Sequence, residues 1–168
     1  AAHDQNVLHR DIKPENIILL PTQDPERQDL AKLVDFGLAK ARATQDDETS
    51  DSGSHTLVRT RTGGFMGTPR YTPPEQAVGD KLGPYTDLFA LGLVIAEWLT
   101  GEVRLQGQTH SELMSNLVGP TPIEYADTPK AWHDWLKRLL VKDPTARYQD
   151  AREALDALTQ TVEVSLAG

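Results

Sequence analysis

Three polar side chains of different charge type lie close together in the segment HRDIKPEN, residues 9–16. Asp11, Lys13 and Asn16 bring a carboxylate, an ammonium group and an amide into one short loop that leads into an apolar run. A second carboxylate, Asp35, follows another apolar run further along the chain. Because Mg²⁺ binds one or two carboxylates together with waters and phosphate oxygens, a hairpin that returned Asp35 to Asn16 would create a magnesium site.

Two short apolar runs predict that hairpin. Residues 17–20 (IILL) and 31–34 (AKLV) are separated by the polar, proline-containing stretch PTQDPERQD, a pattern typical of two strands joined by a loop. Residues 40–67 are rich in Thr, Ser, Asp and Gly and have almost no periodic apolar pattern, which predicts a long loop. A loop of that length inside a domain indicates function or regulation.

Helices are expected after the long loop. Residues 86–100 are apolar on nearly all sides, which predicts a central buried helix. Thr128 and Pro129 predict the N-cap and first residue of a second helix, and Asp150 with Glu153 predicts the capped start of a last amphipathic helix. Apolar residues recur at helical spacing in the second of these helices: Trp132, Trp135, Leu136 and Leu139. The expected fold is mainly α with a small β-hairpin.

Composition narrows the range of partners. The 168 residues, 38% of them hydrophobic, are enough for one compact domain. A net charge of −8 argues against binding to nucleic acid or to an anionic membrane. The chain has no cysteine, which excludes disulfides and thiolate metal sites and fits a reducing compartment. The longest apolar stretch, residues 88–99, falls short of the roughly 20 residues that cross a bilayer. We therefore expect no nucleic-acid partner and no membrane segment in this chain.

Five motifs in a fixed order carry a family resemblance. HRDIKPEN is followed by DFG at residues 35–37, GTPRYTPPE at 67–75, YTDLFALG at 85–92 and KDPTARY at 142–148. Together they resemble the eukaryotic-type (Hanks-type) serine/threonine protein kinases over nearly the whole chain. The tripeptide PEQ after the long loop is similar to bacterial members of that family.

The resemblance implies a domain organisation. It implies the α+β kinase fold without its N-lobe, because the chain contains no Gly-rich phosphate loop, no strand lysine for the α- and β-phosphates and no partner glutamate for that lysine. Residues 1–160 would form the C-lobe of the catalytic domain, followed by a C-terminal tail at 161–168. Within the C-lobe, the expected parts are a catalytic loop at 9–16, an activation segment at 35–75 and a helical subdomain at 84–160.

Catalytic roles also follow from the resemblance. Asp11 would be the base that accepts the proton of the substrate hydroxyl, and Lys13 would neutralise the transferring γ-phosphoryl group of ATP, as in serine/threonine-specific members. Asn16 and Asp35 would hold Mg²⁺ across the ATP phosphates. Thr68 would lie near Asp11 and Lys13 and shape the acceptor site.

Regulation by phosphorylation is the next implication. Arg10 resembles the arginine that binds a phosphorylated activation loop, since a guanidinium group can form a bidentate pair with phosphate. Thr60 and Thr62 lie where bacterial relatives carry their activating threonines.

Five further residues resemble structural members of the family. Glu75 and Arg147 would form a buried ion pair, and Asp87 would anchor the backbone of the HRD motif. His9 and Phe36 would stack in the core between the lobes. The remaining histidines lack metal-ligand spacing, and we expect them in surface or core positions: His3, His55, His110 and His133.

Two functions remain open at this point. The first is a serine/threonine kinase that transfers the ATP γ-phosphate to protein substrates and needs its missing N-lobe for activity. We expect that kinase to be cytoplasmic, or to be the cytoplasmic part of a larger membrane-anchored receptor kinase. The second is a non-catalytic, pseudokinase-like binding module. The N-lobe motifs just upstream of Ala1 in the gene would distinguish the two.

Overall fold

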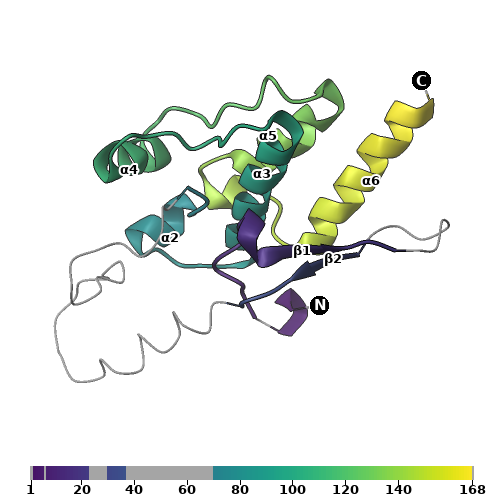
Figure 1. The fold of residues 1–168 in the computed structure, drawn as a ribbon, viewed down its shortest axis with the longest axis horizontal. Coiled ribbons are helices and arrows are strands. Elements are labelled where there is room, and N and C mark those ends of the chain that lie inside the picture. The colour runs from purple at the N-terminus through teal and green to yellow at the C-terminus, as the bar shows by residue number, and fades with distance from the viewer. Residues whose placement is uncertain (1, 6, 23–29, 37–69, 168) are drawn as a thin grey trace.

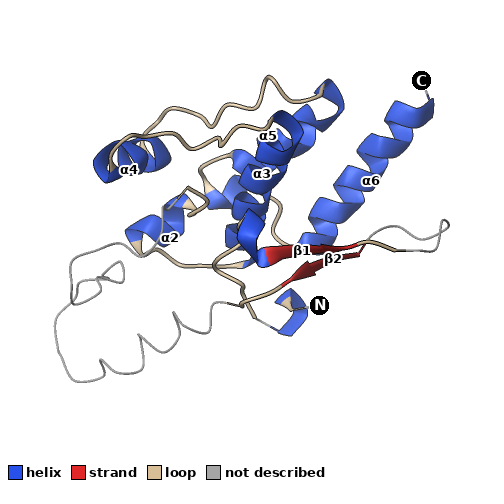
Figure 2. Ribbon diagram, in the orientation of Figure 1, coloured by secondary structure: helices blue, strands red, loops and turns tan. Residues whose placement is uncertain are grey.

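The computed structural model describes residues 2–5, 7–22, 30–36 and 70–167, and these form mostly helices beside one two-stranded sheet (Figures 1 and 2). This arrangement confirms the mainly α fold with a small β-hairpin. Where η marks a 3₁₀ helix, the elements are η1 (His3–Gln5), η2 (Pro14–Asn16), β1 (Ile17–Leu20), β2 (Leu30–Leu33), α2 (Pro74–Val78), α3 (Pro84–Thr100), α4 (His110–Val118), η3 (Lys130–Trp132), α5 (His133–Leu140), η4 (Pro144–Ala146) and α6 (Ala151–Ala167).

The hairpin has the antiparallel pairing that its two apolar runs predict. Leu20 lies opposite Leu30, so β2 begins one residue earlier than the predicted strand. Val34 follows β2, and its N–H donates to the carbonyl oxygen of Asn16 at 3.0 Å. The end of the second strand is therefore fixed beside the residue that precedes the first.

Helix α3 is the central buried helix that the sequence predicts, and it lies in the middle of the helical layer in Figure 1. Pro84 occupies its first turn, and Gly101 ends it in the left-handed conformation with φ of 77°. Phe89 is fully buried on this helix. Helix α5 packs closely against it at Gly92, where an added Cβ would come within 3.0 Å of the Leu139 Cβ.

The predicted start of the second helix was wrong. Thr128 does not cap a helix, because the N-cap positions of η3 and α5 belong to Pro129 and Trp132; its hydroxyl donates to the carbonyl oxygen of Tyr125 at 2.7 Å. Pro129 precedes the 3₁₀ turn η3, and α5 begins only at His133, whose Nε2 lies 2.9 Å from the Thr128 carbonyl oxygen. Three members of the predicted apolar face are buried on α5, Trp135, Leu136 and Leu139, whereas the fourth, Trp132, lies in η3 and is half-buried against the core.

The last helix starts where the sequence places it. Asp150 accepts a hydrogen bond from the Glu153 N–H at 2.8 Å, while the Glu153 carboxylate accepts one from the Gln149 N–H at 2.7 Å. Trp135 Nε1 donates to the Ala154 carbonyl oxygen at 2.7 Å and so joins α5 to α6. Helix α6 continues to Ala167, through most of the stretch expected to be a C-terminal tail.

Candidate active site

The backbone beside Asp11 is held in an unusual conformation. Arg10 and Asp35 have φ values of 63° and 56°, in the left-handed region that side chains other than glycine seldom adopt. Such a conformation persists where neighbouring groups enforce it. At Arg10, Asp87, 3% exposed on α3, does so by accepting the N–H groups of His9 and Arg10, each at 2.8 Å. The central helix thus fixes the loop that carries the candidate catalytic residues.

The structure brings Asp11, Lys13 and Asn16 into one hydrogen-bonded group. Lys13 Nζ donates to Asp11 Oδ2 at 2.8 Å, and Asn16 Nδ2 donates to the Asp11 carbonyl oxygen at 2.8 Å and to Oδ2 at 3.2 Å. The Asp11 and Lys13 side chains are 35% and 36% exposed, whereas Asn16 is buried. The Asp11 carboxylate is therefore oriented from two sides and still open to a substrate.

The hairpin brings the residue before Asp35 to this group. Asp35 follows Val34, which hydrogen bonds directly to Asn16, and it is exposed. Because the Asn16 amide nitrogen donates to Asp11, its Oδ1 is the atom left to bind a cation. A carboxylate and an amide oxygen fit Mg²⁺, which takes its other ligands from waters and phosphates. In the described part of the chain, no three His, Asp or Glu residues gather into a metal site of their own.

His9 and Phe36 contact each other beside the site. The His9 ring is 2% exposed, and its Nε2 lies 2.9 Å from the Val34 carbonyl oxygen, so that nitrogen carries the proton. The two ring centroids are 4.7 Å apart at an interplanar angle of 46°. This contact joins the catalytic loop to the residues that follow β2.

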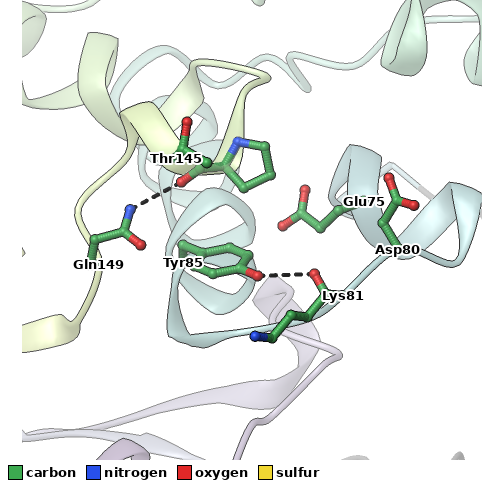
Figure 3. A pocket seen from close by; sticks show the side chains of 7 residues that line it. Glu75, Asp80, Lys81, Tyr85, Thr145 and Gln149 are labelled. Carbon is green, nitrogen blue, oxygen red and sulfur yellow. Dashed lines mark hydrogen bonds between the residues drawn. The ribbon is translucent and has the colours of Figure 1, made fainter.

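Glu75 and Arg147 form a buried ion pair. Arg147 Nη1 and Nη2 donate to the two Glu75 carboxylate oxygens at 2.8 and 3.1 Å, and the residues are 1% and 3% exposed. The guanidinium carbon also lies 4.4 Å from the centroid of the Phe89 ring. Figure 3 shows the pocket beside this pair, which has seven lining residues: Glu75, Asp80, Lys81, Tyr85, Pro144, Thr145 and Gln149.

Some contacts near the site involve residues to which the sequence assigned no role. His3 Nε2 lies 2.9 Å from Asp87 Oδ2, so a histidine expected in a surface or core position contacts the residue that anchors the loop. The Tyr71 hydroxyl donates to Glu97 at 2.5 Å; burial raises the pKa of Tyr71, and this hydrogen bond raises it further. His3 and Asp87 are 84 residues apart in the sequence, and Tyr71 and Glu97 are 26 apart, so no local pattern indicates either pair.

One more unassigned residue touches the catalytic loop. Gln76 Nε2, on α2, donates to the carbonyl oxygen of Arg10 at 3.1 Å.

Three of the predicted site residues, Thr60, Thr62 and Thr68, lie outside the described residues.

Comparison with known proteins gives the family. The model of the protein kinase domain matches residues 1–159. The chain belongs to the protein kinase family. This match confirms the predicted family and agrees with the mainly helical fold and its small hairpin.

The chain is similar to several bacterial proteins. It is 34% identical over 164 residues to the serine/threonine-protein kinase pkn2 of Myxococcus xanthus, which covers 94% of this chain and 18% of that protein. It is also 34% identical over 160 residues to PknB of Mycobacterium tuberculosis, covering 90% of this chain and 22% of that protein. These names confirm the resemblance to bacterial serine/threonine kinases. The chain spans only about a fifth of the length of these relatives.

No helix within the described ranges is long and apolar enough to span a bilayer.

Proposed function

We propose that this chain is the C-lobe of a serine/threonine protein kinase, which in its complete form transfers the γ-phosphate of ATP to hydroxyl groups of protein substrates. The arrangement of Asp11 carries the proposal. Its carboxylate is oriented by Lys13 and Asn16 and is 35% exposed, and the hairpin bonds Val34, the residue before Asp35, to the Asn16 carbonyl oxygen.

Each of these side chains has a chemical task in the transfer. Asp11 aligns the substrate hydroxyl and accepts its proton as the oxygen bonds to the γ-phosphorus and the bond to ADP breaks. Lys13, 2.8 Å from Asp11, offsets negative charge on the transferring phosphoryl group. Asn16 Oδ1 and the Asp35 carboxylate would hold Mg²⁺, which when bound neutralises charge on the ATP phosphates. Such an arrangement serves catalysis, and a non-catalytic binding module would not require it.

Exposed apolar side chains on the hairpin support the assignment to the C-lobe. Apolar residues of a two-stranded sheet normally need a cover from another element. Those of β1 and β2 are 43–62% exposed: Ile18, Leu19, Leu20 and Leu30. We propose that the N-lobe packs on this surface and that ATP binds between the lobes. The chain without an N-lobe then lacks many contacts that position ATP, and it transfers no phosphate at a useful rate.

The proposal includes a regulatory element and a location. Phosphates on Thr60 and Thr62 would pair with Arg10 and order the activation segment, and Thr68 would shape the acceptor site. The kinase would act in the cytoplasm, either as a separate protein or as the cytoplasmic part of a membrane-anchored receptor.

A transfer assay tests the proposal. The chain alone and the chain joined to a kinase N-lobe are incubated with radiolabelled ATP, Mg²⁺ and a protein acceptor, and the labelled residues are identified after acid hydrolysis. We expect label on serine or threonine with the joined protein and none with the chain alone. Label on tyrosine only, or no label with the joined protein, would contradict a serine/threonine kinase. Transfer by the chain alone would contradict the need for the N-lobe.

A further inference from the structure

Arg10 is held by hydrogen bonds on both sides of its Cα. Asp87, on α3, accepts its N–H at 2.8 Å. Gln76, on α2, donates to its carbonyl oxygen at 3.1 Å. Since Arg10 has a φ of 63°, its conformation depends on such external contacts.

The orientation of the Arg10 carbonyl group determines the position of the Asp11 backbone. The peptide bond is planar, so the Arg10 carbonyl and the Asp11 N–H and Cα move as one rigid unit. A rotation of that unit displaces the Asp11 carboxylate. A general base must lie within about 2.6–3.2 Å of the proton that it accepts, and a small displacement therefore affects catalysis.

A stabilising effect on the fold does not explain why a glutamine stands at position 76. Its Oε1 is buried and has no hydrogen-bond partner among the described residues. A buried acceptor without a partner destabilises the folded state, and an apolar side chain of the same length would avoid that cost. The contribution of this side chain therefore lies in what Nε2 does.

We propose that Gln76 is a positioning residue for phosphate transfer. It fixes the peptide group between Arg10 and Asp11 and connects α2, at the end of the activation segment, to the catalytic loop. The inference rests on the proposed role of Asp11 and adds to it a residue that acts through the backbone.

The test compares two glutamine variants in the complete kinase. Gln76→Met removes the donor and the unpaired oxygen at nearly constant length. Its matched control is Gln106→Met, because Gln106 Nε2 also donates to a backbone carbonyl, that of Val103, at 3.1 Å in the loop after α3. Loss of one hydrogen bond should lower the kcat of Gln76→Met about threefold to tenfold. The KM for ATP should stay unchanged, and the melting temperature should stay unchanged or rise. Gln106→Met should keep the parent kcat.

A second readout is independent of activity. A hydrogen bond to the Arg10 carbonyl group polarises the peptide group that contains the Asp11 nitrogen, so the Asp11 ¹⁵N resonance should shift in Gln76→Met and stay in place in Gln106→Met. An unchanged kcat, or a kcat that falls only in step with the melting temperature, would overturn the proposal. If the parent kinase transfers no phosphate, the proposed function fails. Independently of that result, an Asp11 resonance that does not shift in Gln76→Met would rule out the contact from Gln76.

Discussion

Neutralising Glu75 should destabilise the fold far more than neutralising an exposed partner of an ion pair. In Glu75→Gln, the Arg147 guanidinium stays charged, because arginine does not lose its proton in proteins, and it stays buried at 1% exposure. Arg147 keeps hydrogen bonds to the Val141 and Lys142 carbonyl oxygens at 2.7 and 2.8 Å, but it loses the opposite charge of the carboxylate and one of its two bonds to residue 75, because the glutamine amide nitrogen cannot accept. Leaving a buried charge without its partner costs about 3–5 kcal/mol.

Unfolding experiments would measure that cost. In a chain of this length each kcal/mol lowers the melting temperature by about 2–4 °C, so the expected loss is roughly 6–20 °C. The control is Asp127→Asn, because Asp127 is 52% exposed and its partner Arg104, at 2.7 Å, keeps a second carboxylate, that of Glu102, at 3.6 Å. This change should cost about 1 kcal/mol or less. The double variant Glu75→Gln/Arg147→Met should cost less than the sum of its single changes. If urea denaturation gave Glu75→Gln a free energy of unfolding within about 1 kcal/mol of the parent value, this reasoning would be refuted.

Further predictions concern the metal, pH and the activation segment. Asp35→Ala should abolish Mg²⁺-dependent transfer in the complete kinase, and a normal response to MgCl₂ titration would contradict its role as a ligand. Hydrogen bonds from the Thr145 hydroxyl and N–H lower the pKa of Asp143 below 3.8, so its contribution to stability is present above that pH and is lost as pH falls through the lower, folded value. The stability difference between the parent and Asp143→Asn should therefore vanish in acid, and urea denaturation at several pH values that showed a constant difference would contradict this. Thr60 and Thr62 should be phosphorylated in the active kinase, which mass spectrometry can detect; full activity with both unmodified would contradict phosphate-driven ordering.

The fold was predictable where the pattern along the chain is local. Two apolar runs flanked by polar turn residues gave the hairpin, and a continuous apolar stretch ending at Gly101 gave α3. Thr128 failed as a cap for a local reason too. Its hydroxyl donates to the Tyr125 carbonyl, three residues earlier, and a 3₁₀ turn precedes α5, which the capping pattern does not show.

In the candidate site, too, contacts between residues close in the sequence were predictable and contacts between distant residues were not. Asp11, Lys13 and Asn16 lie within one loop, so their spacing alone brings them together. Gln76 reaches Arg10 across 66 residues, a contact that depends on how α2 packs beside the catalytic loop. The sequence offers no periodic signal for such a pair, and the contact required the folded structure.

The most direct test of the account is the turnover of Asp11→Asn in the complete kinase at saturating Mg²⁺, ATP and protein acceptor. Asparagine keeps the shape of the side chain but cannot accept the proton, so kcat should fall by about 10²–10⁴-fold while the KM for ATP and the melting temperature stay near parent values. The matched change Asp156→Asn, at an exposed position on α6, should leave kcat unaltered. Near-normal turnover of Asp11→Asn would contradict the assignment of Asp11 as the catalytic base.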